Sequence, residues 1–284
     1  MIIRQITVVG SGTMGRGIAY ASAMSGYQTL VYDVSQHALD SASSGIGKLF
    51  STGVEKGKID QASADAAAAR LQYSHVLEAA SAEADVIIEA IPEDMALKRD
   101  LFAQVDLFCG PNTLLASNTS SISITELATV VERRDRFIGL HFFNPVHIMK
   151  LVEIVVGERT SDETVTDAKE LAISLGKKPI VVRDFPGFAT SRLGIALGME
   201  AIRMVEQGVA SPEDIDTAME LGYNHPLGPL ELTDLVGLDV RLSIAEYLAS
   251  TLGARFEPPD LLRNMVKEGK LGKKSGRGFY EWDE

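Results

Sequence analysis

The chain of 284 residues contains a single cysteine, Cys109. One thiol can form neither an internal disulfide nor a thiolate metal site, so we expect a reducing compartment such as the cytoplasm and assign no metal ligands. Long apolar runs are also missing, and none approaches the roughly 18 residues of a membrane span. Residues 1–9 lead directly into a glycine-rich loop, which leaves no room for a cleaved signal peptide.

Positive charge is scarce as well. The chain has 27 Lys and Arg residues against 39 Asp and Glu residues, a formal net charge of −12. Nucleic acids and anionic membranes attract proteins through positive fields, so neither is expected as the main partner. Hydrophobic residues (45%) and charged residues (23%) occur at ordinary globular levels, which excludes a largely disordered chain. At roughly 150 residues per domain, the length favours two domains.

Short β-branched runs alternate with helical stretches up to Asp184. Strands are predicted at 2–9, 29–33, 85–91, 113–116, 136–140, 151–156 and 179–182, and helices at 14–25, 36–56, 61–70 and 94–109. Residues 85–91 are almost continuously apolar, as in a strand buried on both faces. The pattern predicts an α/β fold over residues 1–184, a Rossmann-like, doubly wound and mostly parallel sheet.

The pattern changes at Phe185. Up to Pro259 only helical periodicity is found, so residues 185–284 are predicted to form an all-helical C-terminal domain. Ser211 and Pro212 are typical of a helix start, because serine caps the first turn and proline suits the first helical position.

A G-x-G-x-x-G motif made by Gly10, Gly12 and Gly15 lies between the first predicted strand and helix. In dinucleotide-binding folds the first glycine allows a tight turn, the second lets the backbone approach a pyrophosphate, and the third permits close strand–helix packing. The motif alone also fits an ordinary glycine-rich turn. Here Asp33 ends the second strand, where a carboxylate can bind ribose hydroxyls, and it would repel a 2′-phosphate. The sequence therefore favours NAD over NADP.

His141 and Glu153 are the candidates for proton transfer. His141 ends a predicted strand, and Glu153 interrupts the apolar strand 151–156. A carboxylate in such a run should be paired, and a glutamate on one ring nitrogen of histidine would fix the tautomer for acid–base catalysis. Sequence spacing does not establish contact, and each residue could instead be a satisfied structural group.

A third polar cluster, 117–121, follows the strand 113–116 and includes Ser120. Ligands of doubly wound sheets bind at the carboxyl ends of the strands, where such hydroxyls could hold a carboxamide or a substrate hydroxyl. The alternative is a cap for the next helix.

Together these residues resemble the L-3-hydroxyacyl-CoA dehydrogenase family, most closely its short stand-alone members that act on 3-hydroxybutyryl-CoA. HFFNP followed by MKLVEI, within 141–154, is specific to that family among dinucleotide-binding dehydrogenases. The other matching stretches include GSGTMGRGIA at 10–19, IIEAIPEDMALKRDLF at 87–102, ASNTSSISI at 116–124, HPLGPLELTDLVGLD at 225–239 and GKKSGRGFY at 272–280.

The resemblance implies an NAD-dependent oxidoreductase that interconverts (S)-3-hydroxyacyl-CoA and 3-oxoacyl-CoA. His141 would be the general base, oriented by Glu153, and Ser120 would bind the substrate oxygen near the nicotinamide. Lys56 would contact coenzyme A, and the helical domain would complete the substrate cleft and form a homodimer. The implied cofactor contacts are Gly10, Gly12, Met14, Gly15, Asp33, Glu93, Lys98, Ser120 and Asn144.

One position departs from the family pattern. Members show PGF-x-x-N-R, with an asparagine at the thioester-side carbonyl, whereas this chain has Ser191 there. Its hydroxyl could still donate one hydrogen bond. Two other functions stay open: a related dehydrogenase of a free hydroxy or sugar acid such as gulonate, and a catalytically idle NAD-binding protein.

Overall fold

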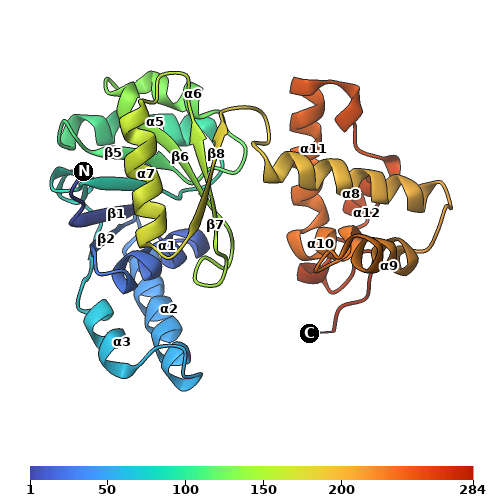
Figure 1. Cartoon of the computed structure of the whole chain (residues 1–284), viewed down its shortest axis with the longest axis horizontal. Coiled ribbons are helices and arrows are strands. Elements are labelled where there is room, and N and C mark those ends of the chain that lie inside the picture. The colour runs from blue at the N-terminus through green and yellow to red at the C-terminus, as the bar shows by residue number, and fades with distance from the viewer. Residues whose placement is uncertain (284) are drawn as a thin grey trace. The chain divides into compact units, whose positions relative to one another are not determined.

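The computed structural model describes residues 1–283, which divide into two compact units (Figure 1). Unit 1 is Met1–Asp184, and unit 2 begins at Phe185. The division falls where the strand pattern gives way to helical periodicity. Within 1–283, no helix combines the length and apolar character that crossing a membrane requires.

Unit 1 contains one eight-stranded sheet in the order β3-β2-β1-β4-β5-β6-β7-β8. The strands are β1 (Gln5–Val9), β2 (Gln28–Tyr32), β3 (Leu71–Ser74), β4 (Val86–Glu89), β5 (Leu114–Ser117), β6 (Phe137–Phe142), β7 (Leu151–Val156) and β8 (Lys178–Arg183). Strands β1 to β6 are parallel, and the strand order reverses between β1 and β4. This arrangement confirms the predicted doubly wound sheet, and sheets of this kind bind ligands outside the carboxyl ends of the strands at the switch point, here β1 and β4.

Strand β7 runs antiparallel to β6, and β8 runs parallel to β7. The connection between β6 and β7, residues 143–150, is shorter than the dozen residues that a parallel crossover needs. The chain therefore turns back on itself and pairs β6 with β7 as neighbours.

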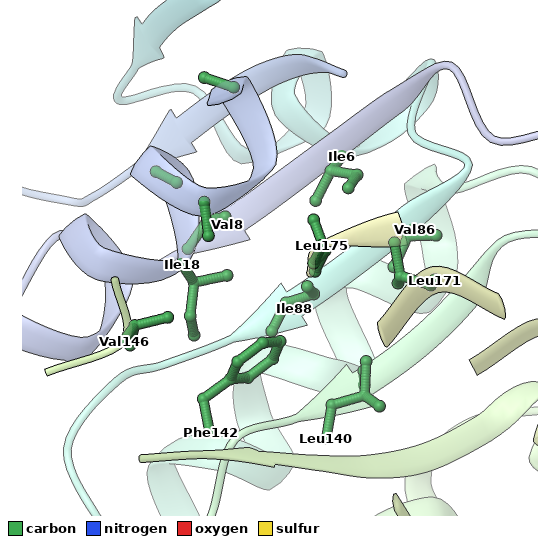
Figure 2. Close-up of a cluster of buried hydrophobic side chains, with 14 of the residues drawn as sticks. Ile6, Val8, Ile18, Val86, Ile88, Leu140, Phe142, Val146, Leu171 and Leu175 are labelled. Carbon is green, nitrogen blue, oxygen red and sulfur yellow. The ribbon is translucent and has the colours of Figure 1, made fainter. Parts of the chain in front are cut away.

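Helices cover the sheet of unit 1: α1 (Thr13–Met24), α2 (Gln36–Glu55), α3 (Gln61–Ala68), α4 (Leu77–Ala82), α5 (Met95–Phe108), α6 (Ile124–Leu127) and α7 (Asp162–Ser174), with 3₁₀ turns η1 (Ala128–Val130) and η2 (Arg134–Arg136). Figure 2 shows the core beneath α1 and α7, where Ile18 and Leu171 meet the inward side chains of β1, β4 and β6. This packing fixes the start of α1 against the sheet.

Unit 2 is helical, which confirms the second half of the predicted fold. It contains α8 (Thr190–Glu206), α9 (Pro212–Tyr223), α10 (Pro229–Val236), α11 (Leu238–Leu252) and α12 (Asp260–Lys267), with 3₁₀ turns η3 (Ala254–Phe256) and η4 (Lys273–Ser275). The Ser211 hydroxyl caps α9 by accepting the Asp214 N–H, as its sequence predicts. Buried Asp234 accepts hydrogen bonds from the backbone of Phe279 and Tyr280, which ties the C-terminal segment to α10.

Candidate active site

The glycine loop connects β1 to α1 at the switch point of the sheet. Gly10 has a φ of +101°, and a Cβ there would lie 2.7 Å from the Ala90 carbonyl oxygen after β4. A Cβ on Gly15 would lie 1.7 Å from the Gly10 carbonyl oxygen, so only glycine fits without a shift of the loop. A Cβ on Gly12 would meet no protein atom within 4 Å. Protein atoms therefore fill the space beside Gly10 and Gly15, whereas the space beside Gly12 is open.

The start of α1 can accept an anion. Gly12 is the N-cap residue, and no side chain caps the helix there. The first amides of a helix need partners and carry the positive end of its dipole, so they attract phosphate. The open position at Gly12 and these amides together fit a dinucleotide pyrophosphate.

Asp33 directly follows β2 and lies beside the loop. Its Oδ2 accepts hydrogen bonds from the Ser11 amide (3.0 Å) and hydroxyl (2.7 Å), and its Oδ1 accepts one from the Ser35 amide. Burial raises the pKa of Asp33, but these hydrogen bonds outweigh it and hold the pKa below its usual value. The carboxylate is therefore ionised at neutral pH and braces the loop by its contact with Ser11.

A buried ion pair lies at the carboxyl end of β4. The Lys98 ammonium, on α5, is 2.5 Å from Oε1 of Glu89 and 3.3 Å from Oε2 of Glu93. Glu89 also accepts a hydrogen bond from the Ser117 hydroxyl at 2.6 Å, which joins the ends of β4 and β5. Charge at such depth is costly unless it is paired and hydrogen-bonded, as it is here.

Ser120 belongs to the segment that follows β5. Its amide and hydroxyl donate to Oε1 of Glu93 at 2.9 and 3.2 Å, beside the Thr119 hydroxyl at 2.6 Å. The cap of α6 is the Ser123 hydroxyl, which accepts the Glu126 N–H. Residues 119–121 are thus organised around Glu93, and the cluster 117–121 does not supply the cap of α6.

His141 and Glu153 face each other across the antiparallel pair β6 and β7, in direct register. The distance between His141 Nδ1 and Glu153 Oε2 is 2.8 Å, and both side chains are buried. The amide of Phe142 donates to Oδ1 of Asn118 at 2.9 Å, which ties this end of β6 to the segment containing Ser120. The structure thus provides a histidine with one ring nitrogen held by a carboxylate.

Asn144 lies in the connection between β6 and β7. It lines a cavity of about 180 Å³ together with Thr13 and Arg16, so the connection borders the start of α1. The half-buried side chain of Met14 packs against the core. Lys56 is the exposed C-cap residue of α2, and Ser191 lies in the first turn of α8 in unit 2.

One residue of this site was not identified from the sequence, Glu89. Glu89 interrupts the apolar run 85–91 just as Glu153 interrupts 151–156, so the same argument would have predicted a buried partner. Ser117 belonged to the predicted polar cluster 117–121, but its hydrogen bond to Glu89 was not predicted.

Comparison with known proteins gives matches over nearly the whole chain. The model of the 3-hydroxyacyl-CoA dehydrogenase NAD-binding domain matches residues 5–185, and that of the C-terminal domain matches residues 187–282. A probable 3-hydroxybutyryl-CoA dehydrogenase of Bacillus subtilis is 48% identical, over 100% of this chain and 99% of that protein.

Two solved structures show the range of similar proteins. The (S)-3-hydroxybutyryl-CoA dehydrogenase of Ralstonia eutropha has a TM-score of 0.96 at 42% identity, with complete coverage of both chains. A diketoreductase that acts on dicarbonyl compounds has a TM-score of 0.86 at 30% identity, over 99% of this chain and 100% of that one.

Proposed function

Since the chain belongs to the 3-hydroxyacyl-CoA dehydrogenase family and is an NAD-dependent oxidoreductase, we propose that it interconverts (S)-3-hydroxyacyl-CoA and 3-oxoacyl-CoA, with short chains such as 3-hydroxybutyryl-CoA favoured. The matches confirm the resemblance and the cofactor inferred from the sequence. The observation that carries the proposal is the buried hydrogen bond between His141 and Glu153 at the ligand-binding edge of the sheet.

The proposed mechanism uses this pair for the proton. With Nδ1–H donated to Glu153, the opposite nitrogen, Nε2, presents a lone pair that takes the proton of the 3-hydroxyl group during oxidation and returns it during reduction. The Glu153 carboxylate stabilises the imidazolium that forms. NAD, when bound, would supply the hydride chemistry at C3 of the acyl chain. The Ser120 hydroxyl would bind the reacting oxygen.

Binding of the anionic acyl-CoA does not require a positive net charge. The amides at the start of α1 are proposed to hold the cofactor, and exposed Lys56 to contact coenzyme A. Unit 2 is proposed to contribute to substrate binding and to form a homodimer. Apolar side chains exposed on α8, α10 and α11 support this interface: Leu193, Leu232, Leu235, Val236 and Val240.

The test is a spectrophotometric assay with NADH and NADPH against 3-oxoacyl-CoA esters of increasing length. We expect turnover of acetoacetyl-CoA with NADH, and falling kcat/KM for longer chains and for NADPH. Oxidation of free hydroxy acids or gulonate without activity on the CoA esters would assign the alternative dehydrogenase function. NADH binding without turnover of any of these substrates would indicate the idle binding protein.

The substitution Ser191→Asn restores the residue that the family usually has in the first turn of α8. We expect kcat/KM for acetoacetyl-CoA to stay the same or to rise. The asparagine side chain is longer than that of serine, and its NH₂ group can donate a hydrogen bond to the thioester-side carbonyl. Steady-state kinetics with Ser191→Ala as the matched control measure this effect. A large fall in kcat/KM for Ser191→Asn would contradict a shared position and role.

A further inference from the structure

The strand that carries His141 extends beyond its neighbour on one side. The register of β5 and β6 ends where Ser117 lies opposite Gly139, whereas β6 continues to Phe142. On the other side, β7 stays paired with this end of β6 and places Glu153 opposite His141. His141 therefore lies in a part of β6 that has a neighbouring strand on one side only.

The side chain of Asn118, the first residue after β5, takes the place of the missing strand. Its Oδ1 accepts a hydrogen bond from the Phe142 amide at 2.9 Å. A backbone N–H only donates, so the side-chain atom that faces it is the amide oxygen and not the nitrogen. The backbone amide of Asn118 itself donates to the Glu89 carbonyl at the end of β4, at 2.9 Å. The half-buried Asn118 thus ties the end of β6 to the ends of β4 and β5.

This hydrogen bond acts on the peptide group that directly follows His141. The nitrogen of Phe142 and the carbonyl of His141 belong to one planar unit, so a bond that holds the nitrogen also holds the backbone of His141. The side chains of Leu140 and Phe142 are buried in the core (Figure 2), and alternation along the strand places the His141 ring on the opposite face of the sheet. Core packing therefore fixes where the strand runs, and the bond to Asn118 fixes the orientation of this peptide group.

We infer that Asn118 is a positioning residue for His141, because its Oδ1 holds the Phe142 amide and thereby the backbone from which the imidazole projects. The Glu153 carboxylate holds the ring at Nδ1, so the two contacts together set the orientation of the imidazole. The inference rests on the proposed function only where it predicts turnover, because the contact between Asn118 and the end of β6 involves no substrate.

The first experiment compares Asn118→Leu with Asn118→Asp, two side chains of nearly the same shape as asparagine. Leucine removes the acceptor, whereas aspartate keeps an oxygen that accepts from the Phe142 amide. We expect Asn118→Leu to lower kcat for the reduction of acetoacetyl-CoA about ten- to a hundredfold with little change in KM, because a small misplacement of a catalytic group costs this much. Asn118→Asp should keep kcat within about threefold of the wild-type value, since its oxygen still accepts the amide.

A direct ligand contact would give a different result. If the side-chain NH₂ group of Asn118 bound the cofactor or the acyl-CoA, both variants would lose that donor, since neither leucine nor an ionised aspartate has one. Asn118→Asp would then be impaired as strongly as Asn118→Leu, which would overturn the inference. Wild-type kcat in Asn118→Leu would overturn it as well.

The second experiment observes His141 without any turnover. Nuclear magnetic resonance spectra of the full-length chain with isotope-labelled histidine report the tautomer and protonation of each ring, and the spectrum of His141→Ala identifies the His141 signals. We expect these signals to shift in ligand-free Asn118→Leu, because the backbone beneath the ring is no longer held. Unchanged His141 signals in folded Asn118→Leu would contradict the inference. If the wild-type chain does not reduce acetoacetyl-CoA, the proposed function fails, and this measurement still decides the role of Asn118.

Asp85 provides the matched control. It is also a half-buried side chain whose oxygen accepts strand amides, those of Arg4 and Gln5 at 2.7 and 2.9 Å, but it lies at the amino end of β4, the edge of the sheet opposite His141. Asp85→Leu should lower Tm and leave kcat and the His141 signals at their wild-type values. An equal fall of kcat in Asp85→Leu would show that lost stability, and not lost positioning, explains Asn118→Leu. If Asn118→Leu does not fold, Asn118→Ala removes the same acceptor with less bulk, and the same results are expected of it.

Discussion

Replacing His141 with alanine is expected to lower kcat for the reduction of acetoacetyl-CoA by NADH at least about a hundredfold. Loss of a positioned general acid or base typically costs a factor of 10² to 10⁴. The His141 ring is buried at one end of β6 and held by Glu153, so a solvent molecule in the space left by alanine would lack the fixed orientation of the imidazole. The measurement is the initial rate of NADH absorbance loss at saturating substrate.

The control for this prediction is cofactor binding. The Kd of NADH should stay within a few-fold of the wild-type value in His141→Ala, because the proposed pyrophosphate contacts lie at the glycine loop. Glu153→Gln keeps a hydrogen bond to the ring but removes the negative charge, and its amide can donate to Nδ1 and leave the proton on Nε2, so we expect kcat to fall about 10²- to 10⁴-fold as well. If acetoacetyl-CoA reduction survives His141→Ala within a few-fold, the proposed proton transfer is wrong.

Local sequence signals were sufficient for much of the fold. The glycine motif fixed the end of β1 at Val9 and the start of α1 at Thr13 to within a few residues, because turn, strand and helix each need different residue types there. The start of α9 was predicted in the same way, because Ser211 is a typical cap for its first turn. The elements of unit 1 that were not predicted include the short edge strand β3, which is only partly buried, the short helix α4, and α7, although Ser161 caps α7 with acidic residues after it.

Contacts between elements were harder to derive. His141 and Glu153 were both singled out, yet whether they touch depends on the direction and register of β7 relative to β6. A shift of one residue in register would place the Glu153 side chain on the other face of the sheet. Lys98 shows the same limit, since only the folded chain reveals its buried ion pair with Glu89.

The net charge of −12 argued against polyanions as main partners, but it did not argue against a dinucleotide. The amides at the start of α1 act over a few ångströms, while the net charge acts through a field that physiological salt screens within about 8 Å. An acidic surface and an anion site can therefore coexist in one chain.

The second large effect is expected at Gly12. Its φ of −66° and ψ of −169° are open to alanine, and the added Cβ would meet no protein atom within 4 Å. Gly12→Ala should therefore fold with an unchanged or slightly higher Tm, since replacing glycine restricts the unfolded chain. The methyl group would occupy the space that the pyrophosphate needs, so we expect the Kd of NADH to rise about ten- to a hundredfold.

Gly15→Ala provides the matched contrast, because the same methyl group is added three residues away. Its Cβ would lie 1.7 Å from the Gly10 carbonyl oxygen, so the loop must move, at a cost of about 1–3 kcal/mol or more. We expect Gly15→Ala both to lower Tm and to weaken NADH binding, whereas Gly12→Ala should weaken NADH binding without lowering Tm. Thermal unfolding and fluorescence titration of both variants measure this difference. Wild-type NADH affinity in Gly12→Ala would show that the open position in the loop is not where the pyrophosphate binds.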